Sequence, residues 1–532
     1  MSENNRKIFV LGLDGASWDL LNPLMDQGVM PNLQKIVEGG TSGVLRSTIP
    51  PYTAPAWVSC VTGVNPGKHG IFGFTLNDSA ASERKFIGSN YVRSPKLWHY
   101  VNAAGKTAGM INIPVTYPAE PVDGFCVPGF LTPLGKEDFT HPVSIYKDFL
   151  KTIGYIINVR IAGIRDFSEE TLLKLIDDIR NCTQKRYEAM KALRKAYDPD
   201  FFMIVFTCMD KIQHKFWKYL DNRDPMYNTL LAQKARPHLI SLYKQVDDII
   251  GKILEDTGNA TTLYIVSDHG FGPKKKILYI NKWLEKNGFL SVRMLAFIKY
   301  RFLLRYMKKM DFSNRNIDVF NNPICKFINA DKSTFLGSDP YEQGVYYIGK
   351  SNQNGYWEDV IKLKQALKEL KDTLTGLPLF DDIYHRDDLF VGNYKDRAPD
   401  LILKMKDYGC DLSRGFPLKN KILTTVEKPA GCHRPAGIFA AYGDNVVGGK
   451  KINASIIDVV PTVLYDIGIP VSKEMDGRVL TELFSSSFQS RQKIEYSSAV
   501  PNPVAGKDQN AGYSNSDQEE IAGRLRDLGY LD

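Results

Sequence analysis

The sequence has little of what marks membrane, secreted or nucleic-acid-binding proteins. No apolar stretch in its 532 residues approaches the ~18–20 residues of a membrane helix, and the run Ile8–Leu13 is too short for the core of a signal peptide. Blocks of Lys and Arg with interleaved aromatic residues are also missing. These absences predict a soluble protein that has no membrane span and does not bind nucleic acid.

Cysteine is scarce as well. The seven cysteines include no Cys-x-x-Cys pair and are Cys60, Cys126, Cys182, Cys208, Cys325, Cys410 and Cys432. An odd number of scattered thiols predicts reduced cysteines in a cytoplasmic protein, and it disfavours a disulfide framework or a zinc site made of cysteines. The net charge of +8 is modest for this length, so it favours anionic partners only weakly.

What the sequence does contain is a set of continuous apolar runs, each of which ends in acidic or imidazole residues. Three such runs occur, at residues 7–13, 201–207 and 262–267. Apolar residues at three- and four-residue spacing predict helices over residues 169–197 and 235–256. The alternation predicts an α/β fold with a mostly parallel central sheet sandwiched by helices. In such a sheet ligands bind beyond the carboxyl ends of the strands, so the residues after the three runs should meet at one crevice.

The segment from residue 274 to residue 426 breaks this pattern and is predicted to be an inserted cap. It contains a basic, aromatic stretch at residues 292–310, which we expect to be a cap helix with its charged ends in solvent rather than a membrane-surface helix. Core-like sequence returns from Gly431 onward. The predicted organisation is a catalytic core of residues 1–273 and 427–484, an insertion of residues 274–426, and a flexible tail of residues 485–532 with a short helix at Asp517–Leu528.

Two pairs of residues follow the second and third apolar runs. Asp210 and His214 are four residues apart, which on a helix places both side chains on one face, where they could share a metal ion. A buried Asp–His hydrogen bond, or a capping Asp beside an unrelated His, would explain this pair equally well. Asp268 and His269 precede Gly270, which permits a turn that would bring both into the crevice. A surface turn is the simpler alternative for the second pair.

Two further residues extend the set. Asp14 follows the first run, and it could also be the N-cap of a helix that begins at Ala16. His433 lies in a Gly-Cys-His-Arg-Pro loop before a predicted strand at residues 437–442, where a histidine is more often an ordinary polar residue than a ligand. Together, however, three aspartates and three histidines at strand ends or turns make two nearly complete sites for divalent metals.

Thr53 is the candidate nucleophile. The surrounding prolines, in Ile-Pro-Pro-Tyr-Thr-Ala-Pro, predict a rigid loop that presents Thr53 at the start of a helix, where free backbone N–H groups favour a bound anion. A hydroxyl is a poor nucleophile at neutral pH unless a metal ion lowers its pKa. The alternative, a threonine N-cap with Pro55 in the first turn, is compatible with this role.

The order of these residues along the chain, from Asp14 and Thr53 to His433, resembles the alkaline phosphatase superfamily. More closely, the sequence resembles the type I phosphodiesterase/nucleotide pyrophosphatase family. The motifs that carry the resemblance are MPNLQKIVEGG at residues 30–40, TGVNPGKHGI at 62–71, SDHGFGP at 267–273, GCHRPAGIFAAYG at 431–443 and IIDVVPTVLYDIGIPVSKEMDG at 456–477. The resemblance covers residues 7–73, 200–273 and 431–484.

This resemblance implies metal-dependent hydrolysis of phosphate esters, as a phosphodiesterase or a nucleotide pyrophosphatase/phosphatase. The reaction would pass through a phospho-threonine intermediate on Thr53, which would lie near or between two divalent metal ions and serve as a seventh ligand. The implied ligands are Asp210, His214 and His433 for one ion and Asp14, Asp268 and His269 for the other. Zinc is usual in the superfamily, with manganese or iron in some branches, and the nitrogen and oxygen ligands fit these metals. A small phosphorylated substrate is expected.

The chain departs from the family at positions next to the substrate. Nucleotide pyrophosphatases carry Pro-Asn-His after the nucleophile and a further Asn that helps to hold the phosphoryl oxygen, whereas this chain has Pro-Ala-Trp and, in place of the further Asn, Phe74. Another donor must replace that amide, and Asn112 and Lys211 are the candidates. The sulfatase relatives need Cys or Ser as nucleophile and Arg four residues later, and Thr53 and Trp57 meet neither requirement.

Two other functions stay open. A phosphomutase or phosphotransferase would pass the phosphoryl group from Thr53 to an acceptor other than water, although those relatives usually use Ser at this position. A non-catalytic binding protein could retain the fold, but its signature would be the loss of an Asp or His from the ligand set, and all six are present.

Overall fold

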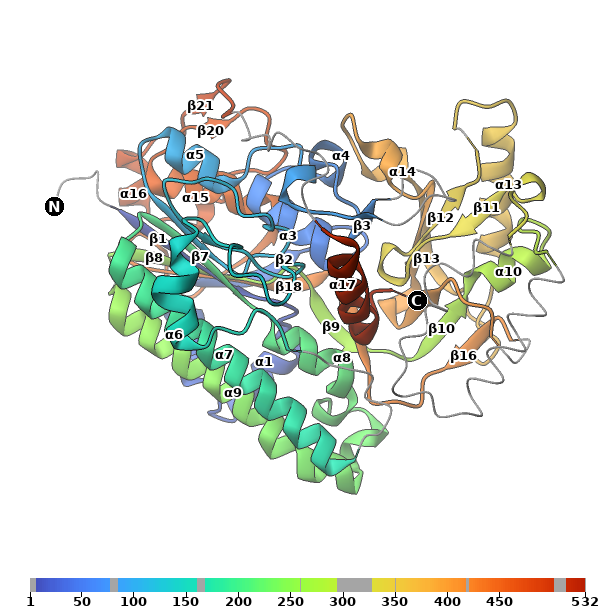
Figure 1. Ribbon diagram of the computed structural model, residues 1–532, viewed down its shortest axis with the longest axis horizontal. Helices are drawn as coiled ribbons and strands as arrows, with labels where there is room; N and C mark the ends of the chain where they lie inside the picture. The colour runs from blue at the N-terminus through green and yellow to red at the C-terminus, as the bar shows by residue number, and fades with distance from the viewer. Residues whose placement is uncertain are drawn as a thin grey trace.

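The computed structural model describes residues 6–76, 85–159, 168–258, 260–293, 328–349, 351–417, 421–501 and 513–531. An eight-stranded sheet lies at the centre of the larger part of the molecule (Figure 1). Its strands are β1 (Lys7–Leu13), β2 (Thr41–Arg46), β5 (Ala108–Ile111), β6 (Gly124–Val127), β7 (Phe201–Phe206), β8 (Thr261–Val266), β18 (Ala436–Tyr442) and β19 (Lys450–Ser455). Their spatial order is β19-β2-β18-β8-β1-β7-β5-β6. β18 runs antiparallel to both of its neighbours and the other pairings are parallel, so the predicted fold class is confirmed.

Side chains of the central strands alternate between two hydrophobic layers. In β1, Phe9 and Leu11 belong to one layer, whereas Ile8 and Val10 belong to the other. This burial on both faces explains why the strands are continuous apolar runs in the sequence. Helices of the first layer are α1 (Trp18–Asp26), α2 (Pro31–Gly39), α7 (Glu169–Tyr197), α8 (Cys208–Leu220) and α9 (Leu230–Thr257). The second layer contains α3 (Thr53–Thr62), α5 (Leu97–Ala103) and α15 (Val459–Ile467).

The two long helices predicted from the sequence are present. α7 has the predicted bounds, α9 includes the predicted interval, and the two lie side by side along one face of the sheet (Figure 1). Shorter elements of this region are α4 (Pro66–His69), α6 (Lys151–Ile153), β3 (Thr75–Leu76) and β4 (Lys85–Phe86).

Residues 274–426, predicted to be an insertion and called the insertion below, contain a hydrophobic core of their own, which includes Leu278, Phe335, Leu363 and Leu403. Its elements are β10 (Lys276–Tyr279), α10 (Ile280–Lys286), β11 (Phe335–Gly337), β12 (Gly344–Tyr347), α13 (Tyr356–Lys368), β13 (Phe380–His385), α14 (Arg386–Leu389), β14 (Leu401–Met405), β15 (Cys410–Ser413) and β16 (Leu423–Thr425). Two antiparallel strands, β9 (Gly270–Pro273) and β17 (Gly431–Arg434), connect it to the core at both ends. The basic stretch predicted at residues 292–310 lies, from residue 294 onward, outside the described residues.

The C-terminal segment contains more structure than the predicted flexible tail. α16 (Ser486–Arg491) packs Phe488 into the second core layer, and β21 (Tyr496–Ser497) pairs in parallel with β20 (Val471–Ser472). The sequence did not predict this contact because Ser and Gln residues surround Phe488. One buried aromatic residue is nevertheless enough to anchor a short helix. The predicted terminal helix is α17 (Asn515–Leu528), which lies between the core and the insertion (Figure 1).

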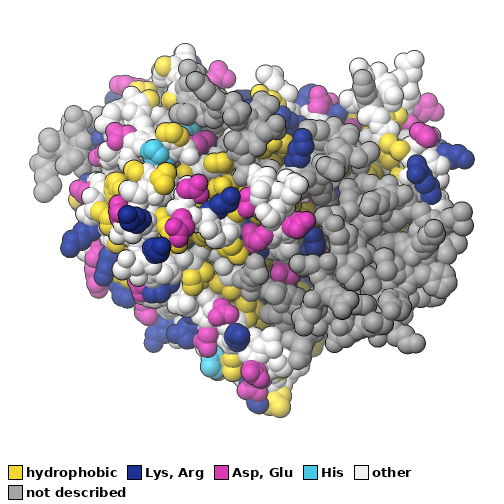
Figure 2. Space-filling model, in the orientation of Figure 1, with side chains coloured by type: hydrophobic (Ala, Val, Ile, Leu, Met, Phe, Trp, Pro, Cys, Tyr) yellow, Lys and Arg dark blue, Asp and Glu magenta, His cyan; other side chains and the backbone are white. Residues whose placement is uncertain are grey.

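The distribution of charge on the surface and the state of the cysteines are those of an ordinary globular protein. On the face shown in Figure 2, basic and acidic side chains are interspersed over the described part of the core. The six cysteines among the described residues are buried and unpaired. Within the described ranges, no helix is both long enough and apolar enough to cross a membrane.

Candidate active site

The carboxyl ends of β1, β7 and β8 bring five of the predicted ligands together. Asp14 directly follows β1, Asp210 lies in the first turn of α8, and Asp268 and His269 follow β8. The backbone N–H of Asp210 donates to the carbonyl of Asp14 at 3.1 Å, which joins the ends of β1 and β7. His214 is one helical turn beyond Asp210, and its Nε2 lies 3.1 Å from Oδ1 of Asp210. The spacing in the sequence therefore placed both side chains on one face of α8, as predicted.

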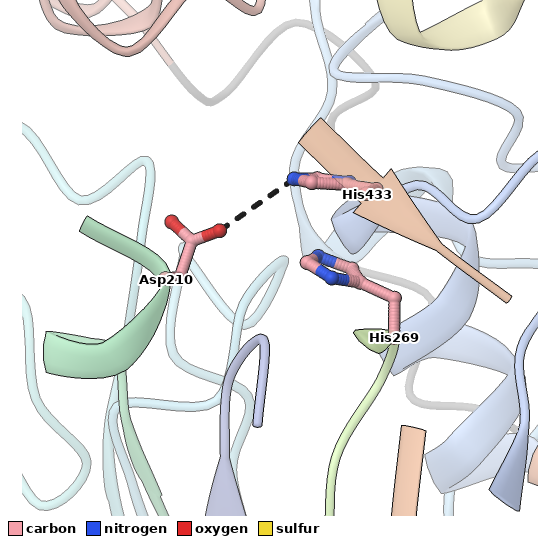
Figure 3. A group of neighbouring side chains, drawn as sticks. All are labelled: Asp210, His269 and His433. Atoms are coloured by element: carbon pink, nitrogen blue, oxygen red, sulfur yellow. Dashed lines mark ion pairs between the residues drawn. The ribbon is translucent and has the colours of Figure 1, made fainter. Parts of the chain in front are cut away.

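His433 completes the group, but from a strand rather than from the predicted loop. It lies on β17, and its ring stacks on that of His269 with centroids 3.5 Å apart (Figure 3). Its Nε2 is 3.0 Å from Nε2 of His214 and 3.6 Å from Oδ1 of Asp210. The sequence around His433 gave no strand signal because β17 is short and has no apolar run. We call these six residues the strand-end cluster: Asp14, Asp210, His214, Asp268, His269 and His433.

Two of the three imidazoles are held so that Nε2 points into the cluster. Nδ1 of His433 lies 2.9 Å from the carbonyl of Pro51, and Nδ1 of His269 lies 3.1 Å from the carbonyl of Gly270. Because a carbonyl only accepts, each Nδ1 carries the proton and each Nε2 presents a lone pair. This is the arrangement in which a histidine binds a metal ion while its other nitrogen fixes the ring.

Two buried carboxylate oxygens of the cluster have no hydrogen-bond partner: Oδ1 of Asp14 and Oδ2 of Asp268. Burial, together with the neighbouring carboxylates, raises the pKa of both groups. Burial also lowers the pKa of His433 to about 4, so its imidazole is neutral near pH 7. Orphaned carboxylate oxygens beside neutral imidazoles are costly to bury unless cations compensate them. The residues therefore fit divalent metal ions.

The ligand atoms fall into two overlapping groups. Atoms of Asp210, His269 and His433 lie within 4.8 Å of one another, and so do atoms of Asp14, Asp268 and His269. His214 joins the first group through its short distances to Asp210 and His433. Carboxylate oxygens and imidazole nitrogens without thiolates are typical ligands of zinc, manganese and iron sites.

Thr53 is the first residue of α3 and faces the cluster. The N-cap of α3 is Tyr52 and that of α1 is Ser17, so neither Thr53 nor Asp14 has the capping role that the sequence left open. Oγ1 of Thr53 lies 3.2 Å from Nε2 of His269, and the residue is 3% exposed. The hydroxyl thus contacts the one histidine that both groups of ligand atoms contain.

Trp57 explains how α3 is held against the cluster. A Cβ at Gly12 would lie 2.6 Å from the Trp57 ring, so the indole packs directly on the backbone of β1. Its Nε1–H donates to Oδ2 of Asp14 at 3.1 Å. A residue that the sequence marked only as a departure from the family therefore fixes the orientation of a candidate ligand.

Gly270 is required by a close approach rather than by a turn, which corrects the sequence-based expectation. It is absent from the glycines with positive φ, and a Cβ at this position would lie 2.0 Å from the carbonyl oxygen of Ala436. The glycine thus lets β9 and β18 come together beside His269.

Aromatic side chains cover Thr53 and the histidines. Sequence reasoning named one of them, Phe74, as a departure from the family and missed the other four. We call this set the aromatic wall: Tyr52, Phe74, Phe130, Tyr341 and Tyr530. Tyr341, from the insertion, has its hydroxyl 3.2 Å from Nδ1 of His214 and its ring centroid 4.3 Å from that of His433. Tyr530, from the C-terminal segment, has its hydroxyl 3.2 Å from Oγ1 of Thr53. The one available signal was the apolar Leu-Gly-Tyr-Leu sequence that follows α17.

The two predicted substrate contacts are engaged elsewhere. The amide of Asn112 donates to the carbonyl of Val205 at 2.6 Å, and the ammonium of Lys211 donates to the side chain of Asn158. Both side chains are buried in these contacts. The structure therefore gives no support to a substrate contact by either residue.

A hollow of about 910 Å³ lies where the insertion meets the core, and it is not the site of these residues. Trp18, Arg223, Phe271 and Arg434 line it, but none of the strand-end cluster does, and neither does Thr53. The strand-end cluster and Thr53 thus lie apart from this hollow, beneath the aromatic wall.

Comparisons with known proteins identify the family and support the fold. The family model of type I phosphodiesterase/nucleotide pyrophosphatase matches residues 8–425. Among solved structures, phosphonoacetate hydrolase from Sinorhizobium meliloti 1021, in complex with phosphonoformate, has a TM-score of 0.54 and 16% identity, over 87% of this chain and 95% of that one. An inactive murine ectonucleotide pyrophosphatase/phosphodiesterase 5, in complex with AMP, has a TM-score of 0.51 and 13% identity, over 90% of this chain and 100% of that one. At such identities the solved structures support the fold alone.

Proposed function

Because the chain belongs to the type I phosphodiesterase/nucleotide pyrophosphatase family, and is therefore a phosphoester hydrolase, we propose that it cleaves small phosphate esters with Thr53 as nucleophile and two divalent metal ions. One observation carries the proposal: Oγ1 of Thr53 lies 3.2 Å from Nε2 of His269, at the junction of the two groups of ligand atoms. A nucleophile belongs at such a junction, where both ions can act on one phosphoryl group.

Each ion has its own ligands in this proposal. Asp210, His214 and His433 would hold one ion, and Asp14, Asp268 and His269 would hold the other. Bound ions lower the pKa of the Thr53 hydroxyl and offset the charge of the phosphoryl group. Zinc is the metal we propose, with manganese or iron as the alternatives.

The reaction has two steps. In the first, Oγ1 of Thr53 loses its proton and attacks phosphorus, so that an Oγ1–P bond forms while the P–O bond of the ester breaks. The leaving group departs with the bonding electrons and takes up a proton. In the second, the oxygen of a water molecule bonds to phosphorus while the Oγ1–P bond breaks, and a proton from that water restores the Thr53 hydroxyl. The product is inorganic phosphate from a monoester, or a phosphate monoester from a diester. Burial of Thr53 beneath the aromatic wall excludes bulk water while the first step occurs.

The insertion acts as a specificity cap in this proposal. Its two connections to the core, β9 and β17, carry or adjoin His269 and His433, and its Tyr341 contacts His214. A segment attached in this way forms one wall of the site, where it selects the leaving group while the core performs phosphoryl transfer. The murine relative binds AMP, so we propose a small phosphorylated substrate for this chain as well.

The test combines metal analysis with a panel of esters. Purified protein should contain divalent metal by elemental analysis, and chelation should abolish hydrolysis of an aryl phosphate monoester and diester. An aryl sulfate should be cleaved much more slowly than either, since Thr53 and Trp57 lack the sulfatase pattern. Active protein without bound metal, or faster cleavage of the sulfate, would contradict the proposal.

A further inference from the structure

Tyr530, near the C-terminus, lies against the proposed nucleophile Thr53, although more than 450 residues separate them in the sequence. Its hydroxyl is 3.2 Å from Oγ1 of Thr53 and 3.4 Å from each carboxylate oxygen of Asp210. In the part of the chain that the structure describes, two side-chain groups lie within hydrogen-bonding distance of Oγ1: Tyr530 and His269. His269 is a proposed metal ligand. Of the two groups, Tyr530 is therefore the one that can contact the transferred phosphoryl group directly.

The ring of Tyr530 is held on several sides. It stacks on Tyr52 with centroids 5.8 Å apart, and its edge meets Phe74 at 5.2 Å. Phe130 and Tyr341 complete its surroundings, at 6.2 Å and 5.0 Å. A phenol packed in this way is preorganised, because its hydroxyl reaches Thr53 without a search among rotamers.

The backbone directs Tyr530 inward. Gly529 ends α17 with φ +87, and the N–H of Tyr530 then donates to the carbonyl of Leu525 at 2.8 Å. This is a Schellman-type helix end, which turns the chain back beneath the helix. The turn therefore aims the residue after Gly529 at the strand-end cluster.

α17 itself packs firmly against the core, which fixes the position of Tyr530. Ile521 and Leu525 are fully buried, and the ammonium of Lys215 donates to the carbonyl of Asp527 at 2.7 Å. Arg524 donates to the carbonyl of Thr132 at 2.9 Å. Helix and tyrosine thus close over Thr53 as one unit.

We propose that Tyr530 is a catalytic residue, whose hydroxyl donates a hydrogen bond to a non-bridging oxygen of the phosphoryl group as it joins Thr53. These oxygens lie one phosphorus atom away from Oγ1, within reach of a phenol that already contacts Oγ1. Tyr530 keeps its proton throughout: it stabilises the developing charge and forms no bond to phosphorus. This inference rests on the proposed function, and it gives the chain the donor that neither Asn112 nor Lys211 supplies.

The test uses full-length, metal-loaded protein and two matched variants. Tyr530→Phe removes the hydroxyl and keeps the ring. The control, Tyr513→Phe, removes a phenol from the same end of the chain, where its hydroxyl donates to the carbonyl of Ile87 at 3.1 Å, away from Thr53. Tyr530→Phe should lower kcat on an aryl phosphate by about 10²-fold, the effect of losing one oxyanion donor, and raise KM by no more than about tenfold. Tyr513→Phe should retain the wild-type rate.

A second readout, equilibrium binding of inorganic phosphate, separates failure of this inference from failure of the proposed function. Tyr530→Phe should bind phosphate about tenfold more weakly than the control. Equal kcat and equal phosphate affinity in the two variants would overturn the role of Tyr530 and leave the proposed function intact. If the wild type cleaved no phosphate ester, the proposed function would fail, and phosphate affinity would still decide whether Tyr530 is a donor.

A third variant tests whether α17 is instead a barrier to the site. Leu525→Asp places a charge in the buried face of α17 and should undock it, so the donor role predicts a loss of rate at least as large as that of Tyr530→Phe. A rate above wild type in either variant would identify the segment as a plug and would overturn the inference.

Discussion

The two sides of the candidate site differ in how the chain builds them. The strand-end cluster comes from strand ends and short turns of the core, and its side chains are charged or metal-binding. The aromatic wall comes from regions far apart in the sequence, with Tyr341 in the insertion and Tyr530 near the C-terminus. In the proposed function, one side supplies ligands and the nucleophile, whereas the other supplies packing and hydroxyl groups. The difference suggests that phosphoryl transfer depends on the core, whereas substrate fit and fine positioning depend on the wall.

The largest effect should follow from a change on the polar side. Thr53→Ala should lower kcat by at least about 10⁴-fold, because no other group can replace the attacking oxygen. Thr53→Ser should retain measurable activity, since it keeps a hydroxyl. Steady-state kinetics on an aryl phosphate provides the measurement, with circular dichroism and metal content as controls for folding. An Ala variant within tenfold of the wild type would remove Thr53 from the nucleophile role.

A smaller effect should follow from Trp57→Phe, which removes the hydrogen bond to Asp14 and keeps an aromatic ring on Gly12. Loss of a partner that orients a metal ligand should weaken affinity for one of the two ions by about 10–100-fold. Competition with a chromogenic chelator measures this affinity. If both ions were retained as tightly as in the wild type, Trp57 would be a packing residue only.

Tyr341→Phe makes the matching change on the aromatic side. It removes the hydroxyl next to His214 and should weaken the other ion, at the lower end of the same range, about tenfold. The same chelator titration, with Trp57→Phe measured in parallel, shows whether the two variants affect different ions. Identical titration curves for the two variants would mean that Trp57 and Tyr341 do not act on different ions.

The smallest effect on activity should come from Asp466, a buried carboxylate outside the site. Burial raises its pKa to about 6, although Tyr264 donates to it at 2.8 Å. In the unfolded chain this carboxyl ionises near pH 3.8, so the folded state loses stability relative to the unfolded state as the pH rises from about 4 through 6. Asp466→Asn should therefore stabilise the protein by on the order of 2 kcal/mol at pH 8 and by much less at pH 4.5, with unchanged kcat.

Chemical denaturation at the two pH values tests this expectation. Equal gains at both would show that the charge of Asp466 is not what limits stability. A change in kcat would show that a buried carboxylate outside the strand-end cluster affects the reaction. The site would then extend beyond the strand-end cluster, Thr53 and the aromatic wall.

Sequence reasoning recovered the polar side because its geometry is local. The four-residue spacing of Asp210 and His214 places both side chains on one face of any helix. Asp14 and Asp268 follow the parallel strands β1 and β8, so they lie at the carboxyl edge of the sheet. The fold class followed from the same apolar runs. His433 was found only through the order of motifs, because its strand has no periodic signal.

The aromatic wall could not be predicted because it depends on tertiary contacts. Nothing in the residues around Tyr341 or Tyr530 indicates which distant segment they contact, and the length of chain between them and Thr53 hides the proximity. The sequence predicted a short helix near the C-terminus, which is α17, but the composition of the tail before it gave no indication that Tyr530 contacts Thr53. Asn112 and Lys211 were chosen mainly by residue type, and in the structure both are buried in other contacts.

The most direct test of the account is to trap the intermediate on Thr53. Metal-loaded protein would be mixed with excess aryl phosphate, quenched in acid within the first turnover, digested and analysed by mass spectrometry. We predict one added phosphoryl group on the peptide that contains Thr53, and none in the Thr53→Ala variant. Steady hydrolysis with an unmodified Thr53 peptide at every quench time, together with wild-type turnover by Thr53→Ala, would contradict it.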